Sequence, residues 1–130
     1  MAPAEIEKGF MKKYPDHNVV KWRWDSKLVA YEGLFYERER KYYAYFNIFG
    51  KWLHTDRHIE VEDLPADVTW EINNTYIREW TVNNVIEQQN SQYDLVYLID
   101  VQAPGNNGRG QKLLLHFLPD GVVVEIERDL

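Results

Sequence analysis

The chain has 130 residues, the length of one ordinary domain, and it can bury a hydrophobic core without disulfides or a structural metal. It contains no cysteine, which excludes thiol catalysis and cysteine metal sites. Fifteen basic against twenty-one acidic residues give a net charge of −6, and the basic residues are scattered, which argues against partners such as nucleic acid or an anionic membrane.

The first predicted element is a short amphipathic helix. Ile6, Phe10 and Tyr14 recur every four residues with charged residues between them, and Pro15 ends the pattern. The period then changes to two, which is typical of strands. Four strands are expected in this half, at 19–24, 29–36, 42–47 and 52–56.

A second helix and a second set of strands are predicted after residue 60. Asp63 is expected to cap the helix, with Pro65 in its first turn. Its apolar stripe is Leu64, Val68, Ile72 and Tyr76. In the strand at 92–101, one face is predicted to lie under the helix, formed by Tyr93, Leu95, Tyr97, Ile99 and Val101. All apolar runs are strand-sized, so no membrane insertion is expected.

The two halves resemble each other in sequence. An offset of 62 residues aligns Phe10 with Ile72, and an offset of 71 aligns Phe46 with Phe117 and Gly50 with Gly121. The second half is therefore longer than the first, and the additional residues fall in the polar stretch 103–110, where a hairpin loop tolerates an insertion. The sequence therefore predicts one α+β domain, 1–130, made of tandem duplicated units at about 4–60 and 61–130. Each unit is a helix plus a four-stranded antiparallel sheet, with the helices packed on one face.

The repeat register also predicts which side chains point away from the helices. The first half then has an outer face with the aromatic and apolar side chains expected to form a binding surface, namely Leu34, Tyr36, Tyr43, Tyr45, Trp52 and His54. Tyrosine and tryptophan anchor interfaces because they combine large area with few rotatable bonds. Three roles remain open for this face: contact with another protein, contact with a second copy as a homodimer, or stiffening of the sheet.

Trp52 is predicted to be the energetic centre of that surface. It follows the Gly50 turn and, by the repeat register, projects outward near Tyr43 and Tyr45. Truncation to alanine is therefore expected to weaken partner binding by about 2 kcal/mol. The same change is expected to alter the free energy of unfolding by less than about 1 kcal/mol.

No catalytic residues, cofactor or metal are predicted. His54, Asp56 and His58 alternate along one strand and could approach a metal from one side, but a solvated polar edge explains them more simply. Serine occurs only at Ser26 and Ser91, neither in the context of an activated nucleophile. An enzyme is therefore not expected.

Several phrases of the sequence resemble the PepSY-like family of small secreted bacterial proteins. They are Phe10-Met-Lys-Lys-Tyr-Pro15, Lys21-Trp22, Tyr31-Glu32, Tyr43-Ala-Tyr-Phe46, Gly50-Lys-Trp-Leu53 and Asp63-Leu-Pro-Ala66. The resemblance implies a fold similar to that of beta-lactamase inhibitor protein, a periplasmic or secreted location after removal of a leader, and no known enzymatic activity. Ile77, where the first half has proline, and the loop 103–110 depart from the family pattern.

Two functions from different classes follow from these observations. The first is a non-enzymatic exported protein-binding or inhibitory module that uses the aromatic outer face. The alternative is a small-molecule-binding or enzymatic cone-shaped domain of the NTF2-like type, which a deep buried pocket containing His54 or His116 would favour.

Overall fold

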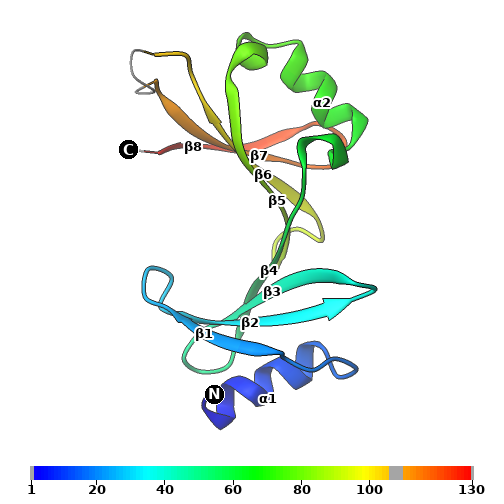
Figure 1. Ribbon diagram of the computed structural model, residues 1–130, viewed down its shortest axis with the longest axis vertical. Helices are drawn as coiled ribbons and strands as arrows, with labels where there is room; N and C mark the ends of the chain where they lie inside the picture. Colours follow the sequence, from blue (N-terminus) through cyan, green and yellow to red (C-terminus); the bar gives the residue numbers. More distant parts are fainter. Residues whose placement is uncertain (1, 106–109, 130) are drawn as a thin grey trace. The chain divides into compact units, whose positions relative to one another are not determined.

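The computed structural model describes residues 2–105 and 110–129, and this part of the chain is an α+β protein with two α-helices and eight strands (Figure 1). The strands form one antiparallel sheet in chain order, β1 to β8. The elements are α1 Ala4–Lys13, β1 Lys21–Asp25, β2 Ala30–Glu37, β3 Arg40–Phe46, β4 Trp52–His58, α2 Ala66–Asn73, β5 Thr81–Asn90, β6 Val96–Gln102, β7 Lys112–Phe117 and β8 Val123–Asp129. Two short 3-10 turns, η1 Val61–Asp63 and η2 Tyr76–Glu79, flank α2.

The chain divides into two compact units. The first contains α1, the strands up to Arg57, and the short segment Gln89–Gln92. The second begins at His58 and contains α2 and most of β5 to β8. The duplication that the sequence suggests stays a prediction, because the strand order alone does not test it.

In the first unit, α1 packs its apolar face on the sheet. Glutamates in its first turn and lysines in its last turn suit the helix dipole, and the helix ends at Lys13, just before Pro15 as predicted. Ile6 and Phe10 are buried on the sheet side, where Phe10 meets the rings of Phe35 and Phe46 at centroid distances of 5.4 and 6.1 Å. Burying such rings is the main stabilising term of this unit.

The β3–β4 turn lies directly against the backbone of α1. Gly50 has a φ of +82°, a conformation that glycine adopts without strain. A Cβ atom at Gly9 would clash with the Gly50 carbonyl oxygen, and one at Gly50 would clash with the Glu5 carbonyl oxygen. Two glycines therefore allow a helix and a turn to approach more closely than side chains would permit.

The prediction that Trp52 lies on the outer face is wrong. The ladder pairs Tyr45 with His54 but Phe46 with Trp52, so β4 carries one extra residue in a β-bulge at this point. The bulge shifts the alternation and brings Trp52 to the helix side, where it packs against the core. Its indole Nε1 donates to Thr55 Oγ1 at 2.9 Å, and the ammonium of Lys13 lies 3.8 Å from its ring centroid.

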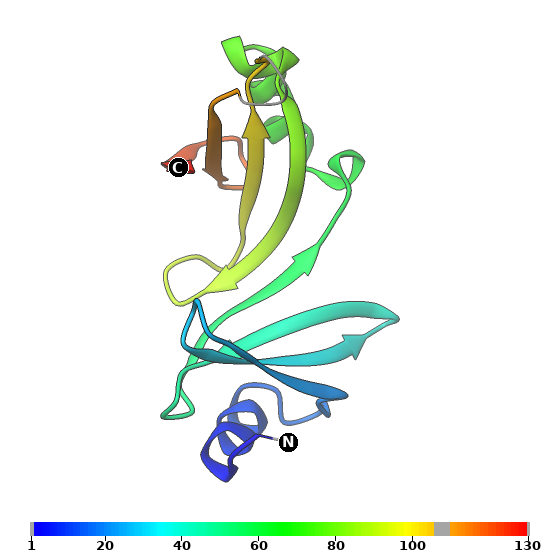
Figure 2. The same cartoon turned by 60° about the vertical axis from the view of Figure 1, so that its left-hand side comes forward.

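The second unit has its own core beneath α2. Figure 2 shows β5, β6 and β7 side by side in antiparallel order. Val68 and Ile72 of α2 pack on this sheet as predicted, over buried positions that include Tyr97, Ile99, Val101, Leu113, Leu115 and Phe117. The prediction that Asp63 caps α2 is wrong. Asp63 belongs to η1, where its carboxylate accepts the backbone N–H of Glu60 at 3.1 Å, and Pro65 precedes α2 instead.

Two further expectations concern loops. Val29 was expected in a strand facing the helix, but it has a φ of +52° and is exposed in the turn before β2. The turn between β2 and β3 is formed by Arg38 and Glu39, both with positive φ, as a tight two-residue hairpin requires. Of the predicted loop 103–110, residues 106–109 lie outside the described part of the chain.

The position of Trp52 changes the expected effect of its truncation. Because its ring packs against the core and donates to buried Thr55, Trp52→Ala should lower the free energy of unfolding by about 2 kcal/mol. Chemical denaturation measures this, with Phe46→Ala as a reference that should lose about 3 to 5 kcal/mol. Trp70→Ala is the matched control, since its ring is exposed on α2 and its loss should cost less than about 0.5 kcal/mol. A Trp52→Ala protein as stable as the Trp70→Ala protein would contradict this placement.

A methyl group at Gly9 tests the contact between helix and turn. In a free helix, replacing glycine by alanine is favourable by about 0.8 to 1 kcal/mol. Here the new Cβ would meet the Gly50 carbonyl, so Gly9→Ala should destabilise the protein by about 1 to 3 kcal/mol. Thermal or chemical denaturation decides the sign. Lys8→Ala, at an exposed position of the same helix, is the control, and a more stable Gly9→Ala protein would rule out the contact.

Candidate functional site

The outer face of the first unit consists of two rows of side chains across its four strands. Cross-strand partners on a sheet point to the same side. One row is Arg23, Glu32, Tyr45 and His54, and the next is Lys21, Leu34, Tyr43 and Asp56. Tyr36 lies beyond them, paired with Lys41. Five of the six predicted surface residues therefore share this face, and Trp52 does not.

A buried carboxylate organises the first row. Glu32 is 6% exposed, and its Oε2 accepts the Tyr45 hydroxyl at 2.6 Å and Arg23 Nη2 at 3.0 Å. Two donors compensate a carboxylate for its loss of water. Burial raises the pKa of the Tyr45 hydroxyl well above its usual range. The hydrogen bond to Glu32 raises this pKa further, because it favours the protonated phenol beside the carboxylate.

His54 and Asp56 form a second polar group on the same face. His54 Nδ1 lies 2.9 Å from Asp56 Oδ1, and Asp56 is 8% exposed. The imidazole also contacts the ring of Tyr45 in a tilted arrangement, with ring centroids 4.5 Å apart and planes 31° apart. Tyr45 therefore lies between the carboxylate of Glu32 and the ring of His54, and its orientation is fixed by both contacts.

This arrangement corrects the expectation of an open apolar patch. Of the predicted residues on this face, Tyr36 is exposed, whereas Leu34, Tyr43, Tyr45 and His54 are half-buried. The exposed charged side chains beside them on this face are basic, although the chain is acidic as a whole: they are Lys21, Arg23 and Lys41. The face thus presents tyrosine and cationic groups around a rigid polar centre.

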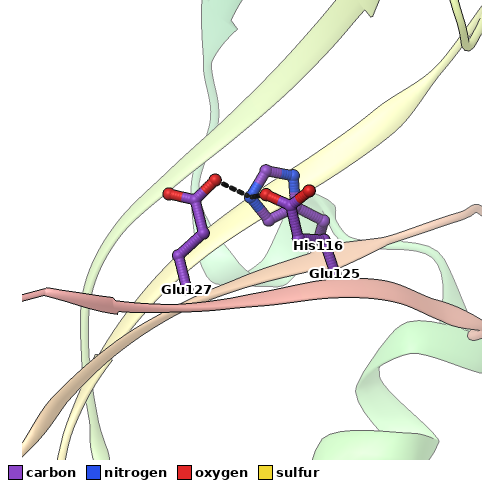
Figure 3. Close-up of side chains that lie close together, drawn as sticks. All are labelled: His116, Glu125 and Glu127. Atoms are coloured by element: carbon purple, nitrogen blue, oxygen red, sulfur yellow. Dashed lines mark ion pairs between the residues drawn. The ribbon is translucent and has the colours of Figure 1, made fainter.

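The alternating His54, Asp56 and His58 were interpreted from the sequence as a solvated polar edge rather than as a metal site. His58 is exposed, and the group of three potential ligands found among the described residues is a different one, His116, Glu125 and Glu127 (Figure 3). Neither glutamate was predicted from the sequence to be a ligand. The offset of 71 residues aligns His116 with Tyr45. This alignment was the one signal in the sequence that the histidine lies beside the two glutamates.

Three cavities in the described structure are small, and neither His54 nor His116 lines them. One of about 230 Å³ lies beside α1 and includes Met11, and one of about 280 Å³ lies between residues 58–61 and 82–85. A third, apolar cavity of about 100 Å³ lies between the end of α2 and β7–β8. These volumes fall below the roughly 300 to 1,000 Å³ of typical small-molecule sites.

Comparison with solved structures gives the fold its relatives. A DUF2874 family protein from Bacteroides ovatus superimposes with a TM-score of 0.77 at 22% identity, over 98% of this chain and 88% of that one. A BLIP-like protein from Bacteroides fragilis gives 0.76 at 20% identity, over 98% and 86%. A candidate periplasmic protein from Bacteroides eggerthii gives 0.72 at 20% identity, over 98% and 89%. No family model and no curated protein matches the sequence.

These likenesses establish a BLIP-like fold, as the resemblance predicted, and at such identities they establish the fold alone. The PepSY-like assignment stays an interpretation of the sequence. In the described part of the chain, neither helix has the length and apolar character needed to cross a bilayer.

The raised pKa of Tyr45 predicts how stability depends on alkaline pH. The unfolded chain loses the tyrosine proton near pH 10, whereas the folded protein retains it, so this contribution to stability is present below about pH 10 and is lost as the pH rises further. The free energies of unfolding of the native protein and of Tyr45→Phe, measured by denaturation at several pH values across this range, should converge as the pH rises. Burial also raises the pKa of Tyr14, and the resulting contribution to stability is the same in both proteins. Tyr36→Phe is the exposed control, and parallel curves for Tyr45→Phe would contradict the assignment.

Proposed function

We propose that this chain is a non-enzymatic, exported binding module that contacts another protein through the outer face of its first unit. The contact surface consists of Leu34, Tyr36, Tyr43, Tyr45 and His54, with Lys21, Arg23 and Lys41 at its rim. Trp52 is excluded, because the bulge places it on the helix side. The exported location is proposed from the candidate periplasmic protein among the structural neighbours.

The observation that carries this proposal is the fixed geometry of the face. The Tyr45 hydroxyl donates to Glu32, and the Tyr45 ring contacts the ring of His54. A surface whose side chains are already ordered loses little conformational entropy on binding, so more of the interaction energy contributes to affinity. Tyr36 adds a ring that is 46% exposed in the free protein and so has area to bury.

The charge of the face indicates the kind of protein partner. Its exposed charged side chains are the cationic Lys21, Arg23 and Lys41, of which Arg23 pairs with Glu32. Its carboxylates Glu32 and Asp56 are buried, and Asp56 lies beside His54. Complementary potentials favour an acidic surface on the partner and increase the rate of association. Arginine and tyrosine together are also the residues enriched at the energetic centres of protein interfaces.

Photo-crosslinking tests this surface directly. A benzophenone amino acid at position 36 or 43 should give a discrete adduct with a second protein in a Bacteroides envelope extract, identified by mass spectrometry. The same probe in place of Trp70, an exposed ring on α2, should not. Because the face is cationic, Lys41→Glu should weaken formation of the adduct more than about tenfold, whereas Lys8→Glu on α1 should leave it unchanged.

Three outcomes would contradict the proposal. An adduct of twice the mass of the chain would make the face a homodimer contact rather than a site for another protein. Equal labelling from positions 36, 43 and 70, or none from 36 and 43, would leave these side chains with a structural role in the sheet.

A further inference from the structure

The hairpin of β7 and β8 brings one imidazole and two carboxylates together on the outer face of the second unit. His116 and Glu125 are direct cross-strand partners, and Glu127 follows two residues later on the same side of β8. One potential ligand atom from each of the three side chains lies within 4.8 Å of the others. Figure 3 shows both carboxylates beside the ring of His116.

The distances within this group fit a metal ion. His116 Nε2 lies 3.4 Å from Glu125 Oε2 and 3.3 Å from Glu127 Oε1. Two ligands bound at about 2.05 Å to a tetrahedral zinc ion are themselves about 3.3 Å apart. The distance from the nitrogen to each oxygen therefore matches the distance between two ligand atoms of such a coordination shell.

The histidine nitrogen supplies an independent indication. Nε2 of His116 is buried and makes no hydrogen bond in the structure, although buried polar atoms normally have a partner. It is directed between the two carboxylates (Figure 3). An ion bound there would accept the lone pair that neutral imidazole offers to metals and would join this nitrogen to the two carboxylates that it now faces as ion pairs.

We propose that His116, Glu125 and Glu127 form a binding site for a divalent transition-metal ion of the zinc type. One nitrogen and two carboxylate oxygens suit zinc and its neighbours, whereas magnesium and calcium prefer oxygen ligands alone. The glutamate side chains are 54% and 50% exposed, so a fourth position on the ion faces solvent and takes water. All three ligands belong to the second unit, whereas the residues of the proposed binding face belong to the first.

Zinc titration of the purified chain tests the proposal. Calorimetry with Zn²⁺ should show one saturable site, and Mg²⁺ in the same range should show none. His116→Gln and Glu127→Gln should each weaken zinc affinity by more than about tenfold, since each removes a ligand. His54→Gln is the matched control: it removes a half-buried histidine that has one carboxylate beside it, and it should leave zinc affinity unchanged.

A spectroscopic readout separates ligation from a loss of folding. In nitrogen-resolved NMR of the imidazoles, Zn²⁺ should shift Nε2 of His116 and leave His54 in place, with the circular dichroism spectrum unchanged. Zinc affinity that is the same in His116→Gln, or a native chain that shows no saturable zinc binding, would overturn the proposal. The group would then be a histidine paired with two glutamates.

Discussion

One extra residue in the ladder between β3 and β4 decides which side chains each face of the first unit presents. A strand alternates strictly, so an insertion of one residue exchanges the faces of everything on one side of it. Here the exchange sends Trp52 to the core and leaves His54 and Asp56 outside. The β7–β8 ladder has its irregularity at the corresponding point, between His116 and Phe117, and there Glu125 stays outside.

The parts of the fold that follow from periodicity could be predicted from the sequence. The apolar spacing of Ile6 and Phe10 gave α1, and the alternation around Ile99 gave the face that β6 buries. The face of Trp52 could not be predicted, because a bulge is a property of the hydrogen-bonded pair and leaves no period in either strand alone. Val29 was misplaced for a similar reason, since a β-branched residue at positive φ goes against local preference.

The sequence predicted which face of the sheet most of the candidate residues share, but it did not predict the polar character of that face. The register correctly gathered Tyr36, Tyr43 and Tyr45, but it carried no information on which polar groups would be buried with them. Glu32 was not recognised, because an acidic residue in an alternating strand usually faces solvent. Its partners, Arg23 and Tyr45, come from different strands, so their meeting on one carboxylate oxygen depends on pairing across the sheet.

The buried carboxylate of Glu32 also restricts the outer face to one arrangement of its side chains. A core of apolar side chains tolerates small rearrangements, whereas a carboxylate without its donors loses several kcal/mol. Removal of either Arg23 or Tyr45 would leave Glu32 with one donor in a place that water hardly reaches. The face is therefore held in one arrangement by polar contacts, while the opposite side of the same sheet is held by packed rings.

The contact between Gly9 and Gly50 makes the two ends of β3 unequal in how they accept changes of length. At the β3–β4 end, the turn residues lie against the helix backbone, and an inserted residue would have to displace α1 before it found room. At the other end, Arg38 and Glu39 form an exposed tip whose strands are already paired up to Glu37 and Arg40. A grafted peptide or a reporter sequence would therefore be accommodated at residues 38–39. The same insertion at residues 48–50 would displace α1.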